Sequence, residues 1–281
     1  MPLDLSSVGT TTEPSLFTYD WKAVALYALG IGARRDELDY VFDGRGPKVY
    51  PTFAVVPALP VVTACLARTQ GDIAMVVHGG QTVRAHAPLP PEGTLVTTGT
   101  IAAIYDLRKM AQVVIEARTC LQGQSEPVVE TTWSIIFRGA GGFGGSPAPT
   151  RADADAPRER PADFHVEQAT SPEQALLYRL SGDLNPLHAD PAFAAMVGFP
   201  QGPILHGLCT YGFAARAVIG AACDGDASRL RVFEGQFRKP VWPGETLVTE
   251  GWKLDGGRYA VVTRVKERGD AVLSSAYAEI A

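Results

Sequence analysis

The sequence predicts an α+β protein built from two similar halves, each with an antiparallel sheet wrapped around one long helix. The segment 91–99, PEGTLVTTG, matches the segment 243–251, PGETLVTEG, at six of nine positions and an offset of 152 residues. Tyr27-Ala-Leu matches Tyr178-Arg-Leu at an offset of 151 residues, which indicates an internal duplication.

A stretch rich in glycine, proline and alanine separates the two halves. Such a composition is typical of a linker. We therefore predict an N-terminal repeat over residues 1–138, a linker over 139–161 and a C-terminal repeat over 162–281.

The second half shows the helix and its sheet most clearly. Apolar residues recur at helical spacing over 205–222, and almost all other positions there are small, which predicts a buried helix. Runs rich in β-forming residues, separated by Pro-Gly, Gly-Gly and Gly-Asp turns, follow it at 229–238, 246–254, 258–268 and 271–280. A helix followed by an antiparallel sheet indicates that the sheet packs around the helix.

The first half shows the same order of elements. It has a helical pattern, a long apolar stretch and then strand-like runs, at 21–29, 52–69, 93–105, 111–121 and 128–138 respectively.

Two short helices are expected before the buried helix of the second half. Ser171 and Asp190 each precede a proline, the usual arrangement of a helix cap and first turn. Glycine and Asn-Pro between them rule out a continuous helix over 181–188. Asp183 and His188 are therefore expected on a loop between two helices.

Composition limits the classes of function. The chain has 281 residues, 46% hydrophobic and 20% charged, with a formal net charge of −5, which is typical of a soluble globular protein. Without a dense basic tract, we expect neither nucleic-acid nor membrane-surface binding. No leader and no apolar run of membrane-spanning length is apparent, and the C-terminus lacks a Ser-Lys-Leu address, so we expect a cytoplasmic protein.

No cofactor site is predicted. The run Gly139-Ala-Gly-Gly-Phe-Gly144 satisfies G-x-G-x-x-G, but Ser-Pro-Ala-Pro follows it instead of the helix that a dinucleotide site needs. His188 and His206 are too far apart in the sequence to form a local ligand pair, and the cysteines are widely spaced, so no metal is expected. G-x-S-x-G is absent and Cys209 lies in the apolar helix, which argues against nucleophilic hydrolysis.

Asp183 and His188 are the best candidates for chemistry. A carboxylate and an imidazole five residues apart can converge on one water and move protons near neutral pH. On residue types alone, an aspartate that caps a turn and a histidine that only packs are about equally plausible. Gly207 lies in the first turn of the buried helix, where free N–H groups could form an oxyanion hole, although a glycine chosen for tight packing is also common.

At this point a family resemblance becomes apparent. The motif YRLSGDLNPLH at 178–188, followed by PILHGLCT at 203–210, strongly resembles the MaoC-like type 2 (R)-specific enoyl-CoA hydratases. This family includes the hydratase domain of the peroxisomal multifunctional enzyme. His78-Gly-Gly-Gln and the runs at 88–90, 138–145 and 237–240 extend the resemblance over most of the chain. It implies a double hotdog fold.

The resemblance also implies roles for single residues. Asp183 and His188 would be the catalytic pair, Asn185 would position groups beside them, and the Gly207 N–H would bind the thioester oxygen. Substrate contacts would fall on His78, Gly79, Lys109, Tyr178 and Phe237. The first half has Gly32 opposite Asp183 and no N-P-x-H, so the N-terminal repeat would be non-catalytic and would accommodate the acyl tail.

The expected activity is the reversible hydration of a trans-2-enoyl-CoA to the (3R)-3-hydroxyacyl-CoA in fatty acid metabolism, such as β-oxidation. Coenzyme A is part of the substrate, and no other cofactor is expected. A homodimer is expected because an open sheet edge commonly pairs. The alternatives are a (3R)-hydroxyacyl-ACP dehydratase, a hotdog acyl-CoA thioesterase and a silent acyl-CoA-binding module.

Overall fold

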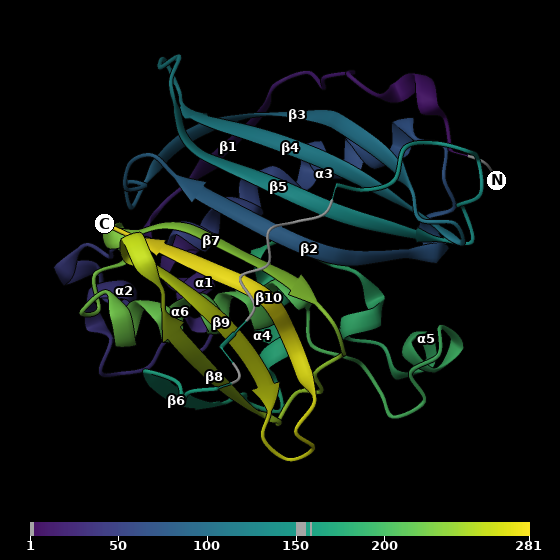
Figure 1. Cartoon of the computed structure of the whole chain (residues 1–281). Helices are drawn as coiled ribbons and strands as arrows, with labels where there is room; N and C mark the ends of the chain where they lie inside the picture. The colour runs from purple at the N-terminus through teal and green to yellow at the C-terminus, as the bar shows by residue number, and fades with distance from the viewer. Residues whose placement is uncertain (1–2, 150–155, 158) are drawn as a thin grey trace.

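A single sheet runs through both halves of the chain in the computed structural model, which describes residues 3–149, 156–157 and 159–281 (Figure 1). The strand order in this ten-stranded sheet is β1-β3-β4-β5-β2-β7-β10-β9-β8-β6, and all neighbouring strands are antiparallel. The strands are β1 (Ser15–Tyr19), β2 (Val76–Ala85), β3 (Gly93–Asp106), β4 (Met110–Leu121), β5 (Pro127–Arg138), β6 (Phe164–Ala169), β7 (Leu230–Phe237), β8 (Thr246–Lys253), β9 (Arg258–Val265) and β10 (Ala271–Ile280).

Each half of the sheet packs against its own long helix. The helices are α1 (Trp21–Gly30), α2 (Leu38–Val41), α3 (Val55–Arg68), α4 (Gln174–Tyr178), α5 (Pro191–Met196) and α6 (Gly207–Ala222). α3 contacts β3 and β4, and α6 contacts β8 and β10. Figure 1 shows both helices on the same side of the sheet, so the predicted α+β class with two wrapped helices is confirmed.

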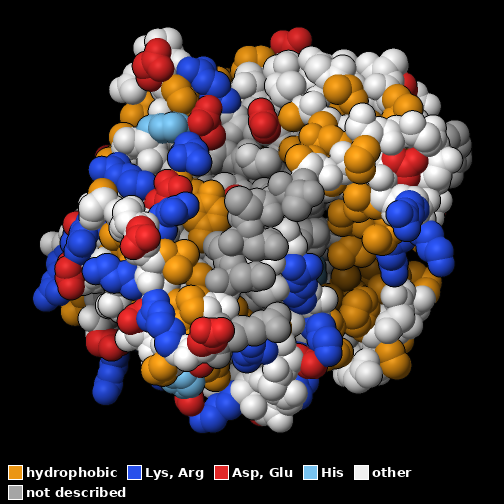
Figure 2. Space-filling view, in the orientation of Figure 1, with side chains coloured by type: hydrophobic (Ala, Val, Ile, Leu, Met, Phe, Trp, Pro, Cys, Tyr) orange, Lys and Arg blue, Asp and Glu red, His pale blue; other side chains and the backbone are white. Residues whose placement is uncertain are grey.

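The central helix of the second half is buried on nearly all sides. Every residue from Leu208 to Ile219 is buried. This agrees with the small and apolar composition that predicted a covered helix, because such a helix has no polar face to leave in water. The outer face of the second half-sheet carries charges of both signs (Figure 2). The ion pairs Lys266–Glu167 and Arg264–Glu250 belong to this half.

The two half-sheets are joined by pairing between β2 and β7. The register runs from Gly80 opposite Gln236 to Arg84 opposite Val232. This backbone ladder makes one sheet from two repeats, and it brings the first residues of β2 beside the last residues of β7. Side chains from both repeats therefore meet there.

Three strands were missing from the sequence prediction. β1 and β6 are short strands at the two outer ends of the sheet, and β2 contains Gly79 and Gly80. Glycine is unfavourable in strands, so β2 has little local signal. Its ladders with β5 and β7 override that preference.

The first part of the predicted linker packs against the β3–β4 hairpin. The Asp106 carboxylate accepts hydrogen bonds from the N–H groups of Gly142 at 2.9 Å and Gly144 at 2.8 Å. Two amides of the G-x-G-x-x-G run, those of Gly142 and Gly144, thus bind a carboxylate of this chain. The part of the linker at 150–155 and 158 lies outside the described residues.

The stretch Pro51–Arg68 has a mean hydropathy of 1.5 over 18 residues, which is long and apolar enough for a membrane span. We did not expect such a stretch from the sequence. It is 56% buried and it contains α3, around which the first half-sheet wraps, so its apolar character is explained by the core.

One ion pair links the repeats inside the protein. Arg216 of α6 is 8% exposed, and its Nε donates to both Glu37 carboxylate oxygens at 2.9 and 3.0 Å. Its Nη1 donates to the Ile31 carbonyl at 3.3 Å. The helix of the second repeat thereby holds the loop after α1 in the first.

We expect Glu37→Gln to lower the free energy of unfolding by about 2 kcal/mol, because it leaves the Arg216 charge buried without its counter-ion. The value is below that of a fully buried pair because Glu37 is partly exposed. Chemical denaturation measures it. The exposed Glu92→Gln should change stability by less than about 0.5 kcal/mol, and an equal effect of both variants would contradict the role of the pair.

Candidate active site

The loop with the predicted catalytic pair is shaped by its own side chains. Gly182 has a φ of +120°, a conformation that favours glycine, and it turns the chain out of the preceding 3-10 turn. The Asp183 Oδ1 accepts from the Asn185 N–H at 3.2 Å, and the Asn185 Oδ1 accepts from the Leu187 N–H at 3.0 Å. Asn185 therefore caps the short 3-10 turn Pro186–His188, which carries the imidazole.

The orientation of the His188 ring follows from a single hydrogen bond. The His188 Nδ1 lies 2.8 Å from the Ile204 carbonyl oxygen. A carbonyl oxygen only accepts, so Nδ1 carries the proton, and Nε2 of the neutral ring has a free lone pair. This is the form of histidine that can accept a proton from water.

His206 packs directly on His188, which the sequence reasoning did not predict. The two rings stack with centroids 3.7 Å apart and an interplanar angle of 28°. The His206 Nε2 donates to the Asp183 backbone oxygen at 3.1 Å, while its buried Nδ1 has no hydrogen-bond partner among the described residues. The distance in the sequence hid this contact, since only the fold brings the helix start back to the loop.

Asp183, His188 and His206 form one cluster. The carboxylate oxygen and the ring nitrogens that they offer all lie within 4.8 Å of one another. Two hydrogen bonds of about 2.8 Å at a tetrahedral water oxygen would join atoms about 4.6 Å apart. The separation therefore suits a single water held between the carboxylate and an imidazole.

Burial keeps the imidazoles of the site uncharged at neutral pH. Desolvation lowers the pKa of His188 below its ordinary value, and the nearby Arg179 lowers it further, while the Ile204 carbonyl and Asp183 oppose the shift. Desolvation and the neighbouring His188 lower the pKa of His206 to about 2. Desolvation also lowers the pKa of His78 to about 4, against the opposing effects of the Gly80 carbonyl and Asp183.

The start of α6 lies beside this cluster. Gly207 is the first residue of the helix and follows His206 directly, and in the described part of the chain its N–H donates to no acceptor. A Cβ atom at this position would lie 3.4 Å from the Phe237 ring. The 16-residue helix therefore presents a free N–H donor at its positive end, and the glycine adds no side chain beside it.

His78 of β2 brings the first repeat to the site, where it meets Phe237 of β7 from the second repeat. The His78 ring stacks on Trp133 at 5.1 Å and lies 4.8 Å from the Phe237 ring. Its Nε2 donates to the Gly80 carbonyl at 3.1 Å. At Gly79 a Cβ atom would lie only 2.7 Å from the Ile136 side chain, which explains a glycine in mid-strand.

Two of the predicted substrate contacts, Tyr178 and Lys109, are less directly connected with the Asp183–His188–His206 cluster. Tyr178 is 2% exposed, and its ring packs 5.0 Å from His206 and 6.0 Å from Tyr27, so it supports the cluster from behind. Lys109 is exposed in the β3–β4 turn, and β5 separates its strand from β2. Their contact with substrate stays a prediction.

The carboxylate and imidazole groups of the cluster are also the types of group that bind metal ions. In a zinc site the lone pairs of the ligands point at one centre about 2.0–2.2 Å away. The ring N–H groups of His188 and His206 are held by carbonyl oxygens, so each neutral ring has one nitrogen left as an acceptor.

The buried thiols are poor nucleophiles. Cys209 donates to the Gly30 carbonyl at 3.2 Å, and burial raises its pKa well above the ordinary value. The thiolate is the reactive form. The described thiol nearest the start of α6 is thus held in its unreactive state.

Comparison with known proteins identifies the family. The MFE-2 hydratase 2 N-terminal domain matches residues 17–139, and the MaoC like domain matches residues 153–275. The chain is 41% identical over 271 residues to 3-hydroxyacyl-thioester dehydratase Y of Mycobacterium tuberculosis, which covers 94% of this chain and 92% of that protein. The chain belongs to the MaoC-like hydratase 2 family.

Other relatives agree in sequence and in fold. The peroxisomal enoyl-CoA hydratase 2 of Arabidopsis thaliana is 40% identical over 278 residues, covering 92% of this chain and 89% of that protein. The crystal structure of a MaoC-like dehydratase from Phytophthora capsici matches with a TM-score of 0.89 at 30% identity, covering 99% of this chain and 98% of the other. A Mycobacterium tuberculosis protein described as a double hotdog matches at 15% identity, with a TM-score of 0.60 and coverage of 97% and 95% of the two chains. The predicted double hotdog fold is confirmed.

We expect Arg179→Met to move the acid limb of the pH–rate profile to higher pH. A positive charge beside His188 disfavours its protonation, so removal of that charge raises the pKa at which the neutral imidazole is lost. The profile of kcat/KM against pH for hydration measures the shift. Arg179→Lys, which keeps the charge, should leave the limb near its wild-type position, and identical profiles for Arg179→Met and wild type would contradict the assignment.

Proposed function

We propose that this protein is a type 2 enoyl-CoA hydratase that reversibly adds water to a trans-2-enoyl-CoA and forms the (3R)-3-hydroxyacyl-CoA. The observation that carries the proposal is the carboxylate–imidazole cluster beside the free N–H of Gly207. Its relatives carry the names enoyl-CoA hydratase 2 and 3-hydroxyacyl-thioester dehydratase, which describe one reaction in its two directions. The R configuration follows the family resemblance.

The reaction needs three things from the protein: a held water, two proton transfers and a site for negative charge. The thioester makes the β-carbon of the enoyl group electrophilic. Water bound between Asp183 and His188 loses a proton to the pair as its oxygen bonds to that carbon. The electron pair of the carbon–carbon double bond moves toward the thioester, the carbonyl oxygen becomes negative, and the pair then delivers a proton to the α-carbon.

Gly207 supplies the site for the negative charge. Its N–H and the dipole of α6 stabilise an oxyanion at the helix start, and the missing side chain lets the thioester oxygen approach. Phe237 of the same repeat and His78 of the other repeat form the neighbouring surface. No redox cofactor or metal takes part in these steps, and activity in the presence of EDTA tests that expectation.

His206 acts as a positioning residue in this scheme. It touches the catalytic pair twice, through ring stacking on His188 and through its hydrogen bond to the Asp183 carbonyl. Its low pKa keeps it neutral, so it adds no positive charge that would oppose transfer of a proton from the water to His188.

We expect Asp183→Asn and His188→Gln each to reduce the hydration rate by about 10²–10⁴-fold, because each removes one partner of the proton transfers. Loss of enoyl absorbance measures the rate for short, medium and long trans-2-enoyl-CoAs, and chiral chromatography identifies the product. Asp255→Asn and His165→Gln, which change exposed side chains away from the cluster, should have wild-type rates. Near-wild-type hydration by either site variant, or an S product, would end the proposal.

We expect Gly207→Ala to reduce kcat/KM by about 10–100-fold, because its Cβ occupies space that the thioester oxygen must enter. Its φ lies outside the left-handed region and its nearest neighbour would be a 3.4 Å contact, so the variant should fold. The matched control is Gly220→Ala in the same helix, where a Cβ meets nothing within 4 Å. Equal kinetics of the two variants would remove Gly207 from the mechanism.

Three alternatives predict different outcomes. A (3R)-hydroxyacyl-ACP dehydratase would act faster on ACP than on CoA thioesters. A thioesterase would release free thiol from a saturated acyl-CoA. A silent binding module would bind acyl-CoA without changing the enoyl absorbance. The Asp183–His188 cluster favours hydration over the last two.

The remaining expectations concern the protein as a whole. We propose that the N-terminal repeat accommodates the acyl tail, that the protein is a cytoplasmic homodimer, and that it acts away from membranes. The outer strands β1 and β6 are the sheet edges available for pairing between chains. Light scattering tests the dimer, and fractionation tests the location.

A further inference from the structure

The strand order contains a pseudo-two-fold symmetry. Exchanging β1 with β6, β2 with β7, β3 with β8, β4 with β9 and β5 with β10 maps the order onto itself. The 152-residue offset also relates Val55 to Gly207, the first residues of α3 and α6. It relates Thr82 to Glu234, which are paired at the β2–β7 junction. Each feature at one end of this junction therefore has a counterpart at the other end.

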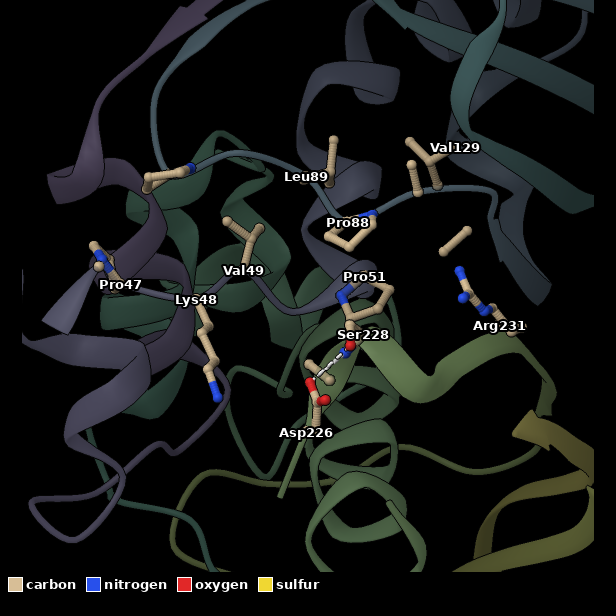
Figure 3. Close-up of a pocket in the computed structure, with 15 residues that line it drawn as sticks. Pro47, Lys48, Val49, Pro51, Pro88, Leu89, Val129, Asp226, Ser228 and Arg231 are labelled. Atoms are coloured by element: carbon tan, nitrogen blue, oxygen red, sulfur yellow. Dashed lines mark hydrogen bonds between the residues drawn. The ribbon is translucent and has the colours of Figure 1, made fainter. Parts of the chain in front are cut away.

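A cavity of about 460 Å³ lies at the counterpart of the candidate active site (Figure 3). The offset relates Pro203, Phe237 and Gly79 of the site to Pro51, Ala85 and Arg231, and all three counterparts line the cavity. It is thus the second of two equivalent positions, and neither Asp183 nor His188 lines it.

The difference in residues explains why this position is hollow. At the candidate active site the Phe237 ring lies beside Gly207 and packs against the His78 ring. Its counterpart is Ala85, whose methyl group leaves the volume of the aromatic ring unfilled. A cavity of this size is within the usual range for small-molecule sites.

The lining is mostly apolar, with positive charge in two places. Figure 3 shows Val49, Pro51, Pro88 and Leu89 between the side chains of Lys48 and Arg231 in this view. These six residues come from both repeats, because the loop before α3 faces the start of β7. The apolar part would bury a hydrocarbon chain, and a cation would meet a charged end.

The charges of the lining favour a ligand with one negative charge. Besides Lys48 and Arg231, the lining includes Asp226, whose Oδ1 accepts from the N–H and hydroxyl of Ser228 at 3.0 and 2.8 Å. Lys48 lies 3.4 Å from Asp39. Among the residues that the structure describes, the Arg231 side chain makes one long hydrogen bond, 3.5 Å to the His86 carbonyl, so most of its donors remain for a ligand.

We propose that this cavity is a second, non-catalytic site that binds a fatty carboxylate, with the hydrocarbon chain among the apolar residues and the carboxylate on Arg231. The lining has two cations and one anion, which matches a single carboxylate better than the several phosphate charges of coenzyme A. The proposal does not depend on the hydration chemistry, since it uses no residue of the Asp183–His188 cluster.

Calorimetric titration of the full-length protein with decanoate tests the proposal. We expect one binding event that Leu89→Trp weakens at least tenfold by filling the cavity. Arg231→Gln should also weaken it about tenfold by removing the cation, whereas decanol should bind both the wild type and Arg231→Gln with similar, weak affinity. Leu16→Trp, at a surface leucine that is 64% exposed, is the control for the added indole and should bind as the wild type does.

Hydration assays on the same variants separate this site from the catalytic one. Leu89→Trp and Arg231→Gln should keep the wild-type kcat and KM, and decanoate should not compete with the enoyl-CoA. Undiminished binding in Arg231→Gln, competition with the enoyl-CoA, or tighter Leu89-dependent binding of decanoyl-CoA than of decanoate would each overturn the proposal.

Discussion

The β2–β7 ladder is the interaction on which the arrangement of the site depends. Without it, each repeat would be a sheet around one helix, and His78 would belong to a different unit from Phe237 and Gly207. The pairing of Gly80 with Gln236 fixes their distance at the level of the backbone. A one-residue slip would turn the neighbouring side chains to the opposite face. The ladder thus makes possible a site composed of residues from both repeats.

Burial has a second role beyond stability in this site. His78, His188 and His206 are all held neutral by desolvation, and the N–H group of each donates to a carbonyl oxygen. These carbonyls select the tautomer, so the remaining nitrogen of each ring is an acceptor. A ring nitrogen of His188 lies within 4.8 Å of an Asp183 carboxylate oxygen. The fold therefore sets the protonation state before substrate arrives.

Much of the fold could be predicted because its strongest signals are local. The runs at 246–254 and 271–280 correspond closely to β8 and β10, since turn residues mark their ends. β2 escaped prediction because its glycines argue against a strand, and only long-range pairing stabilises it. The duplication was visible because one turn-and-strand segment had kept its residues in both halves.

The residues of the candidate site also fall into two groups, those that a local motif predicts and those that only long-range contacts bring together. Asp183, Asn185 and His188 could be predicted because they belong to one continuous motif. His206 also lies in a recognised motif, but its contact with His188 became apparent only in the structure, where the two rings stack. A periodic pattern cannot report a contact between a loop and a helix start eighteen residues away. Asp106 is a similar case, because no local sequence motif predicts its contact with the amides of Gly142 and Gly144.

Covalent joining of the halves has a consequence for how such a protein can change. In an assembly of two identical subunits, any substitution appears at both symmetry-related places, so an aromatic residue needed at one would also fill the other. Here Phe237 and Ala85 are encoded separately. Selection can therefore keep catalysis at one end of the molecule while the opposite end drifts toward an unrelated task.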